Sequence, residues 1–248
     1  MMEGILMSGL AVITGGGRGI GAATSRRLAA DGYRVLLTYA KDSQSAENVI
    51  SDLRAKDVDC VAVKVDCSAP EEVFVLADHP WCTAGVDVLV LNHAMYERSQ
   101  AAELSAAALE RTMSVNFTGS FLVWKALSPH LADDARIIVV GSQMGIKGTP
   151  TGADYSASKG ALHAWARSLA LDVAERGQRV NVVAPGTIDT DIVADDSKER
   201  RRQRTREIPL ARLGLPEEVA GVISFLAGPD STYLVGSIIH VNGGLFRP

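Results

Sequence analysis

The chain has 248 residues, of which 47% are hydrophobic and 22% charged, which is enough to bury the core of one large domain spanning 1–248. Its formal net charge of −4 at pH 7 argues against nucleic acid or an anionic membrane as a partner, because both require a basic surface. The three cysteines do not make a disulfide framework, and no Cys/His cluster has the spacing of a zinc site, so we expect no metal.

The beginning of the chain shows no targeting signal. Residues 1–6 lack a basic region before their short apolar run, which argues against secretion. No stretch of eighteen apolar residues occurs anywhere, so no membrane span is predicted. We therefore expect a cytoplasmic chain.

Short β-branched runs alternate with longer amphipathic stretches. Most of the runs are continuously apolar, as in parallel strands that are covered on both faces. This alternation predicts an α/β fold: a single Rossmann-type, doubly wound, parallel seven-stranded sheet flanked by helices, which binds ligands at the carboxyl ends of its strands. The expected strands are Leu10–Thr14, Arg34–Thr38, Cys60–Val65, Val86–Leu91, Arg136–Val140, Arg179–Val183 and Ile238–Val241. The expected helices lie near 19–31, 43–56, 70–77, 104–130, 153–176 and 216–227.

A glycine-rich turn follows the first expected strand and opens a helix. Its spacing is Thr-Gly-x-x-x-Gly-x-Gly, in which the glycines permit a tight turn and the helix amino end supplies N–H groups to a pyrophosphate. The alternative is a plain strand-to-helix turn. The residues expected to bind a dinucleotide here are Thr14, Gly15, Gly17, Arg18, Gly19, Ile20 and Gly21.

The end of the second strand indicates which dinucleotide is bound. Sheets that bind NAD usually place Asp or Glu here to hold the ribose 2′-hydroxyl, whereas this chain has no acid until Asp42. Arg18 and Lys41 could meet a 2′-phosphate, and Tyr39 lies just before Lys41 in the sequence. These residues favour NADP(H) over NAD(H), although either cation could simply face solvent.

Tyr155 and Lys159 are four residues apart in an expected helix, so they share one face with Cβ atoms about 5–6 Å apart. A fixed cation beside a phenol favours the phenolate, so we expect a lowered pKa for Tyr155. Ser142 follows the fifth strand and Asn116 lies inside a long helical pattern. Singly, these residues could be an exposed helical pair, a turn serine and a surface asparagine; together with the glycine turn they predict a catalytic site.

The segment 195–207 is densely charged and interrupts the alternation. It predicts either a solvated surface helix or part of a mobile lid at 190–208 over a pocket.

Taken together, these motifs resemble the short-chain dehydrogenase/reductase family, and the resemblance covers nearly the whole chain. Besides the glycine turn and the four polar residues, it includes Asp66 and the segments 181–190 and 209–220. It implies that Tyr155 protonates a carbonyl oxygen or takes an alcohol proton, and that Lys159 lowers its pKa and bonds the nicotinamide ribose. Ser142 would hold the substrate oxygen, and Asn116 would keep a water in a proton relay.

The resemblance also implies further contacts with the cofactor. Asp66 and the backbone after it would meet the adenine, while Ile188 and Thr190 would hold the carboxamide. The additional cofactor-binding residues expected from the resemblance are Asp66, Cys67, Asn92, Tyr155, Lys159, Pro185, Gly186, Ile188 and Thr190. The expected substrate contacts are His93, Ser142, Gln143 and Tyr155.

Two positions depart from the family pattern. His93 stands where the family usually has a small residue, and either a structural hydrogen bond or a contact with substrate would explain it. Asn242 replaces a frequent Asp near the carboxyl end and changes little in shape.

The pattern is most similar to bacterial 3-oxoacyl-carrier-protein reductases. We expect an NADP(H)-dependent enzyme that interconverts a ketone and a secondary alcohol, with 3-oxoacyl or polyketide-type ketoreduction as the leading case. A sugar, steroid or polyol dehydrogenase is the alternative, and a non-catalytic nucleotide-binding regulator is the alternative of another class. An acyl carrier protein is a possible partner, and the resemblance implies a homotetramer.

Overall fold

All seven expected strands form one parallel sheet in the computed structural model, which describes residues 9–194 and 196–247, with the side chain of Ile192 left aside. The residues on which the expectation of no secretory signal rested lie outside this described part. The strand order is β3-β2-β1-β4-β5-β6-β7, so the order reverses between β1 and β4, as in a doubly wound fold. The strands are β1 (Leu10–Ile13), β2 (Arg34–Tyr39), β3 (Cys60–Lys64), β4 (Val86–Leu91), β5 (Leu131–Val140), β6 (Arg179–Pro185) and β7 (Ile238–Val241).

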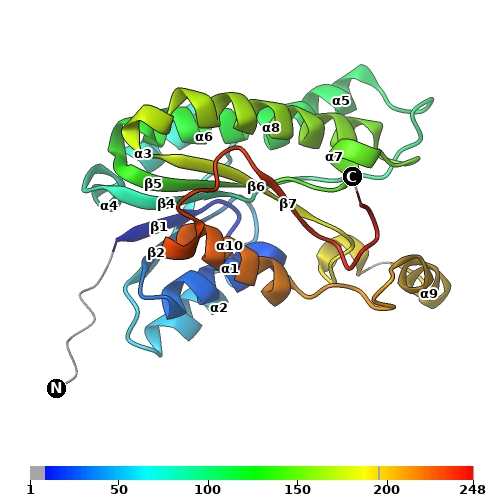
Figure 1. Ribbon diagram of the computed structural model, residues 1–248, viewed down its shortest axis with the longest axis horizontal. Helices are drawn as coiled ribbons and strands as arrows, with labels where there is room; N and C mark the ends of the chain where they lie inside the picture. The colour runs from blue at the N-terminus through cyan, green and yellow to red at the C-terminus, as the bar shows by residue number, and fades with distance from the viewer. Residues whose placement is uncertain (1–8, 195, 248) are drawn as a thin grey trace.

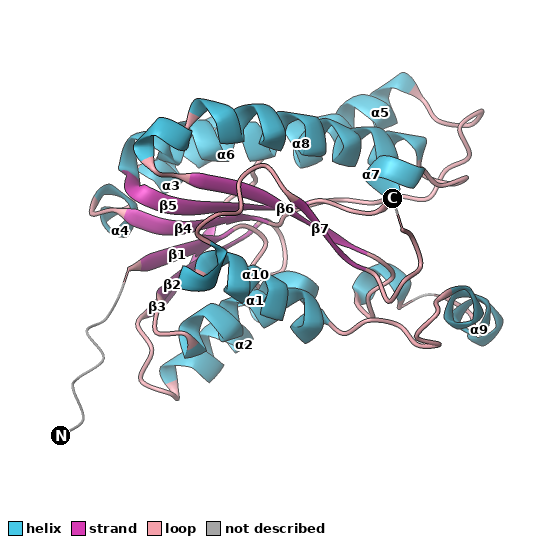
Figure 2. Cartoon of the chain, viewed as in Figure 1, coloured by secondary structure: helices cyan, strands magenta, loops and turns pink. Residues whose placement is uncertain are grey.

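Helices cover both faces of the sheet (Figures 1 and 2). One face carries α3 (Pro70–Ala77), α5 (Ala106–Met113), α6 (Gly119–Leu127) and α8 (Ala153–Asp172). The other carries α1 (Gly19–Ala30), α2 (Ser43–Arg54) and α10 (Pro216–Ala227). The short α4 (Pro80–Thr83) and α7 (Met144–Lys147) lie in connections, and α9 (Lys198–Glu207) lies at one end of the molecule.

Each strand contributes to two hydrophobic cores, because successive side chains of a strand point to opposite faces. In β1, Leu10 and Val12 pack with α3, α6 and α8, while Ala11 and Ile13 pack with α1, α2 and α10. This explains why the strands read as unbroken apolar runs rather than as alternating ones. The doubly wound fold predicted from the sequence is confirmed.

The helix expected over 104–130 contains an irregularity that the sequence analysis missed. A π-helical turn at Ser114–Thr118 joins α5 to α6, and a 3₁₀ turn at Ser128–His130 follows. Asn116 lies in the π turn and is fully buried, so the alternative of a surface asparagine is wrong. π turns within α-helices often occur at functional sites.

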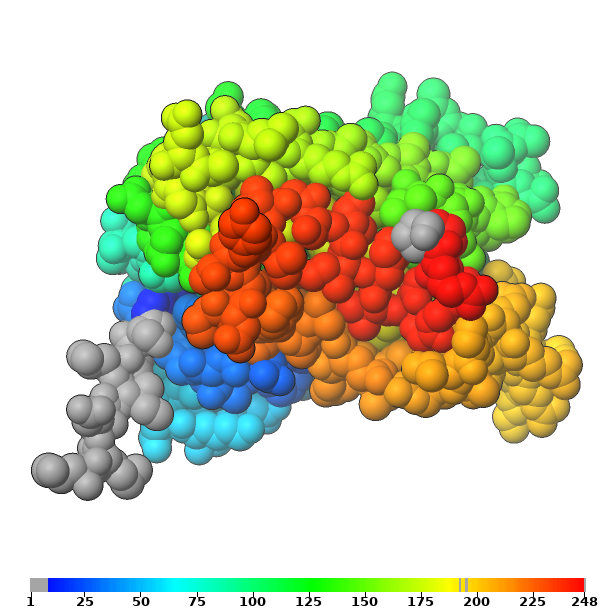
Figure 3. Space-filling view, in the orientation of Figure 1, coloured from blue at the N-terminus to red at the C-terminus, as the bar shows by residue number. Residues whose placement is uncertain are grey.

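The remaining differences lie at the ends of elements. β5 begins at Leu131 rather than Arg136, because Asp133 and Asp134 extend the strand despite their charge. The charged stretch after residue 197 is helical, with the Ser197 hydroxyl accepting a hydrogen bond from Arg200 N at 3.2 Å. Figure 3 shows the carboxyl-terminal residues, in red, lying beside this region.

No helix among the described residues is both long and apolar enough to cross a bilayer. Within the same residues, no cluster of three or more His, Cys, Asp or Glu side chains could hold a metal ion. The three cysteines are all buried as free thiols.

Candidate active site

A cavity of about 670 Å³ lies where the carboxyl ends of β1, β2, β4, β5 and β6 meet. Most of the site residues predicted from the sequence line it. They are Gly15, Gly17, Arg18, Gly19, Ile20, Gly21, Tyr39, Lys41, Asp66, Cys67, Asn92, His93, Ser142, Tyr155, Lys159, Pro185, Gly186, Ile188 and Thr190.

The glycine turn has the shape that a phosphate cradle requires. Gly15 and Gly19 have φ of +63° and +49°, which side-chain-bearing residues adopt only with strain. A Cβ on Gly21 would lie 2.1 Å from the carbonyl oxygen of Gly15. Only glycine at position 21 therefore lets the first turn of α1 pack against the glycine turn. The cavity therefore meets backbone and the amino end of a twelve-residue helix, the arrangement that binds pyrophosphates.

The end of β2 carries no carboxylate before Asp42, whose side chain caps α2 by accepting a hydrogen bond from Ser45 N at 3.0 Å. Arg18 is exposed and makes two loose ion pairs, at 3.7 Å to Asp42 and 3.6 Å to Asp191. Such pairs contribute little, so the guanidinium can turn to an incoming phosphate. The residues present therefore fit a 2′-phosphate-bearing dinucleotide.

Next to this end, Asp66 follows β3 and accepts hydrogen bonds from the backbone and hydroxyl of Ser68, at 2.9 and 2.6 Å. These bonds hold the pKa of Asp66 below its ordinary value, so its carboxylate is fixed in place and charged. Burial raises the pKa of Cys67 to about 12, which makes its thiol unreactive.

Thr14 is fully buried and does not line the cavity, contrary to the prediction of a cofactor contact. Its hydroxyl instead joins the ends of β1 and β4, accepting from Asn92 N at 2.9 Å and from His93 N at 3.2 Å. Asn92 Nδ2 also donates to Thr14 O at 3.0 Å. Thr14 thus stabilises the glycine turn through hydrogen bonds to the end of β4.

His93 has both ring nitrogens in hydrogen-bonding contact with the protein. Nδ1 lies 2.8 Å from Thr14 Oγ1 and Nε2 lies 3.1 Å from Val115 O. Because a carbonyl only accepts, Nε2 carries the proton in this arrangement. Burial and the nearby Lys159 lower the pKa of His93 to about 4, so the ring is neutral near pH 7. These contacts support the structural interpretation of His93.

Ser142, Tyr155 and Lys159 converge on the cavity from the end of β5 and the first turns of α8. Lys159 is 2% exposed, donates from Nζ to Val140 O at 2.8 Å, and lies 5.7 Å from the centre of the Tyr155 ring. Burial lowers the pKa of Lys159 to about 7. The Ser142 hydroxyl accepts from Met144 N at 3.1 Å, and its proximity to Tyr155 lowers the pKa of that phenol.

The pKa of Tyr155 shifts in the direction opposite to the sequence-based expectation. Burial raises it to about 12, and the nearby Ser142 hydroxyl offsets only part of that effect. The expectation was wrong because the spacing of Tyr155 and Lys159 revealed their proximity but not their desolvation, which penalises the charged form of each group. Tyr155 is therefore a neutral phenol at neutral pH.

Asn116 and Gln143, both described residues, do not line the cavity. The Asn116 carboxamide accepts from Met95 N at 2.7 Å and donates to Met95 O and to Ser158 Oγ at 3.0 and 2.9 Å. It thereby ties the π turn to the loop after β4 and to α8. Gln143 is 2% exposed and its backbone donates to Pro185 O at 3.1 Å, so the predicted contact with substrate is not supported.

The sequence analysis missed the wall of the cavity formed by the loop after β4. Tyr96 packs its ring against Tyr155, with ring centres 4.7 Å apart, and donates its hydroxyl to Thr151 O at 2.8 Å. Met95 and Met144 also line the cavity. No spacing rule identifies these residues, since their proximity to Tyr155 depends on how two separate loops fold. The one available signal was an aromatic residue, Tyr96, in the loop that follows β4.

A buried carboxylate ties the segment 190–208 to that same loop. The Asp196 side chain is fully buried, with Arg98 at 2.9 Å, Arg200 at 3.4 Å and Arg204 in hydrogen-bond contact. Burial alone would raise the pKa of Asp196, but Arg204 and Arg98 outweigh it and hold the pKa below its ordinary value. Arg98 and Arg204 both line the cavity.

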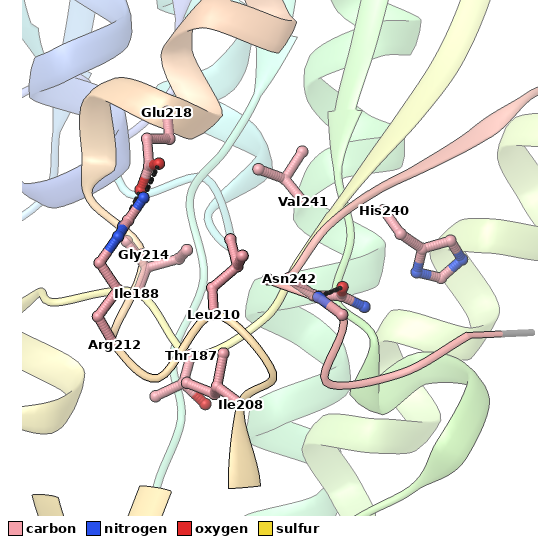
Figure 4. Close-up of a pocket in the computed structure, with 12 residues that line it drawn as sticks. Thr187, Ile188, Ile208, Leu210, Arg212, Gly214, Glu218, His240, Val241 and Asn242 are labelled. Atoms are coloured by element: carbon pink, nitrogen blue, oxygen red, sulfur yellow. Dashed lines mark hydrogen bonds and ion pairs between the residues drawn. The ribbon is translucent and has the colours of Figure 1, made fainter. Parts of the chain in front are cut away.

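A second cavity, of about 250 Å³, lies between β7 and the segment that leads to α10 (Figure 4). Thr187 and Ile188 line both cavities. Its charged wall is the ion pair between Arg212 and Glu218, at 2.6 Å, and the hydrogen bonds from Arg212 and from the Leu215 backbone lower the pKa of Glu218 to about 2. None of the four residues predicted to be catalytic lines this smaller cavity.

Comparison with known proteins identifies the family. Residues 15–246 match a family model described as enoyl-(acyl carrier protein) reductase. The chain belongs to the short-chain dehydrogenase/reductase family. The resemblance drawn from the motifs is confirmed, and the chain is a member of a family of oxidoreductases.

Relatives in this family align over nearly the full chain. A 3-oxoacyl-[acyl-carrier-protein] reductase of Synechocystis sp. is 36% identical over 244 residues, covering 97% of this chain and 98% of its own. A versicolorin reductase of Emericella nidulans is 34% identical over 252 residues, covering 96% of each chain. Among solved structures, a blue fluorescent protein from a metagenomic library, in complex with NADPH, is 35% identical with a TM-score of 0.90, covering 98% of this chain and 99% of its own.

Proposed function

We propose that the protein is an NADP(H)-dependent reductase of ketones, with Tyr155 as the general acid in reduction and the general base in the reverse reaction. The observation that carries this proposal is the convergence of Ser142, Tyr155 and Lys159 on one cavity that also contains the glycine turn. A member of this oxidoreductase family that had become a regulator would have no need of all three groups in one cavity.

The residues present can perform the proton transfer. Tyr155, with its pKa raised to about 12, keeps its proton at neutral pH and can give it to a carbonyl oxygen that becomes an alkoxide. The Ser142 hydroxyl, which lies near enough to Tyr155 to lower its pKa, would hold the same oxygen. Lys159, if protonated, would stabilise the phenolate that remains, a contribution typical of general acid catalysis. When bound, NADP(H) supplies the hydride.

The cofactor proposal depends on the electrostatics at the end of β2. Arg18 and Lys41 line the cavity, and Tyr39 completes that wall. The NADPH complex of the blue fluorescent protein, a structural relative, supports the choice. We expect the Arg18→Ala/Lys41→Ala double variant to bind NADPH at least tenfold more weakly while its Kd for NADH changes little. A wild-type Kd for NADH equal to or below that for NADPH would contradict the choice.

The leading substrate class is a 3-oxoacyl or polyketide-type ketone. The names of two relatives, a 3-oxoacyl-carrier reductase and a versicolorin reductase, support it, as do the apolar and aromatic side chains of Met95, Tyr96 and Met144 in the cavity wall. The test is NADPH consumption with a panel of 3-oxoacyl thioesters, aromatic ketones, sugars and steroids. Turnover of none of these ketones, with NADPH still bound, would contradict the enzymatic proposal.

An acidic carrier protein is the partner that would deliver such a thioester. Helix α9 contains six basic and two acidic residues in a chain of net charge −4, and its Arg204 lines the cavity. We expect exchange of the exposed Arg202 and Arg206 for Glu to lower kcat/KM for a carrier-bound thioester and to leave the value for a short pantetheine thioester unchanged. Equal effects on both substrates would contradict carrier docking on α9.

The proposed homotetramer would bury an aromatic cluster formed by the π turn, α6 and α8. Trp165 makes edge contacts with Phe117, Phe121 and Trp124, and all four rings remain partly exposed in the single chain. Light scattering of the purified protein tests this proposal, and a monomeric mass at micromolar concentration would contradict it.

A further inference from the structure

Helix α8 contacts the end of β5 through a second side chain, one turn beyond Lys159. Lys159 donates to Val140 O at 2.8 Å, and the ring nitrogen Nε2 of His163 accepts from the backbone N–H of Ser142 at 3.3 Å. The two contacts therefore flank Gly141 and fix the backbone on both sides of it. The Ser142 N–H lies beyond the strand ladder, whose last pair is Val140 with Val183, so it depends on a side chain for its partner.

The packing around the ring shows that this contact is built into the fold. His163 is 3% exposed. A Cβ on Gly141 would lie 2.2 Å from His163 Nε2, and a Cβ on Gly145 would lie 3.0 Å from its Cε1. Glycine at these two positions is what allows the imidazole to reach the Ser142 backbone.

The hydrogen bond also defines the protonation of the ring. Nε2 can accept only if it carries no proton, so the neutral ring must be protonated at Nδ1. Within the described part of the chain, Nδ1 is buried without a partner. Burial, with Lys159 and Arg167 of α8 and His240 of β7, lowers the pKa of His163 to about 4, so the acceptor form persists at neutral pH.

We propose that His163 is a positioning residue: by accepting the Ser142 N–H it holds the backbone that aims the Ser142 hydroxyl at Tyr155 and at the substrate oxygen. This inference rests on the proposed function, because it assigns His163 a part in the same proton transfer. The observed contact runs from His163 Nε2 to the Ser142 backbone, and the Ser142 side chain is close enough to Tyr155 to lower the pKa of its phenol. If His163 only filled space, catalysis would not depend on a hydrogen-bond acceptor at the position of its Nε2 atom.

Two variants of similar size separate these roles. His163→Gln offers an amide oxygen near the position of Nε2, whereas His163→Leu fills the space and leaves the buried Ser142 N–H without an acceptor, which is costly. For NADPH-dependent ketone reduction, we expect His163→Leu to lower kcat about tenfold or more with little change in the Kd for NADPH, and His163→Gln to stay within about threefold of wild type. Thermal unfolding of both variants shows whether they are equally folded.

A second measurement does not depend on turnover. In protein labelled with 15N-histidine, we expect the His163 signals, assigned by their loss in His163→Gln, to show a protonated Nδ1 and an unprotonated Nε2 near pH 7. The opposite tautomer would overturn the proposal, and so would a folded His163→Leu with the kcat of wild type. Equal losses of kcat in both variants would also overturn it, since packing alone would then explain them. A wild-type protein that reduces no carbonyl would instead overturn the proposed function, and the catalytic part of this inference with it. The nitrogen signals would still show whether His163 Nε2 accepts the hydrogen bond from Ser142 N.

Discussion

Two regions that border the cavity are held in place by different forces. At the end of β5, Lys159 bonds a backbone carbonyl and is almost fully buried. In the segment 190–208, the contacts are ion pairs, centred on Asp196 with Arg98 and Arg204. The first region depends on short hydrogen bonds shielded from solvent, and the second on pairs whose arginine partners reach solvent.

The difference suggests that the end of β5 fixes the reacting groups while the segment 190–208 can open and close. Shielded hydrogen bonds respond little to salt, so they keep reacting groups in fixed positions. Ion pairs whose arginines reach solvent can be exchanged for others more readily. We call Ser142, Tyr155 and Lys159 the catalytic floor of the cavity. We propose that the segment 190–208 is a lid that closes over this floor through the ion pairs of Asp196. Asp195, within that segment, lies outside the described residues.

The largest expected effect comes from removing the proton donor of the floor. Tyr155→Phe should lower kcat for ketone reduction by about 10²–10⁴-fold, because the ring remains while the hydroxyl that donates the proton is lost. NADPH binding, followed by fluorescence quenching, should change little and serves as the control for folding. A variant that keeps the kcat of wild type would show that the proton comes from elsewhere.

The next effect is on stability and follows from the burial of Lys159. The pKa of Lys159 is lowered to about 7 in the folded chain. Between about pH 7 and the ordinary lysine pKa of the unfolded chain, the unfolded chain therefore binds more protons than the folded chain. The unfolding free energy should therefore rise with pH across this window, relative to Lys159→Met, by about 2 kcal/mol between pH 7 and 9.

Urea unfolding of the two proteins at both pH values measures this difference. Lys147→Met is the matched control, since it makes the same substitution at an exposed position. A difference that stays constant with pH would mean that Lys159 is solvated in the folded protein.

Sequence patterns predicted the floor far better than the lid, for physical reasons. The strand Val86–Leu91 was predicted to the residue, because an apolar run covered on both faces has sharp ends. Tyr155 and Lys159 followed from helical spacing. By contrast, the Arg98 partner of Asp196 lies in a loop almost a hundred residues away, and the raised pKa of Tyr155 depends on burial. Neither feature has a local pattern.

A smaller effect is expected when the lid contact is weakened. Asp196→Asn removes the charge that holds Arg98 and Arg204, so α9 should open more often. We expect tryptic cleavage within its arginine-rich sequence to accelerate several-fold and KM to rise, with kcat little changed.

Asp191→Asn is the control for this variant. Asp191 also lies in the segment, but its side chain is 70% exposed and meets Arg18 only at 3.6 Å, so its loss should leave the cleavage rate near that of wild type. Equal rates in Asp196→Asn and wild type would show that Asp196 does not hold the segment closed.

The smallest effect tests where the rigid floor ends, at Tyr96 in the loop that contacts both regions. Tyr96→Phe keeps the ring against Tyr155 but loses the hydrogen bond to Thr151 O. We expect a loss of about 1 kcal/mol in unfolding free energy and a kcat within about twofold of wild type, since the ring and not the hydroxyl borders the phenol. Tyr96→Ala removes the ring as well and should raise KM for bulky ketones more than for small ones. If Tyr96→Phe lowered kcat as strongly as Tyr96→Ala, the hydroxyl rather than the ring would position Tyr155, and the fixed part of the site would extend into the loop that carries Arg98.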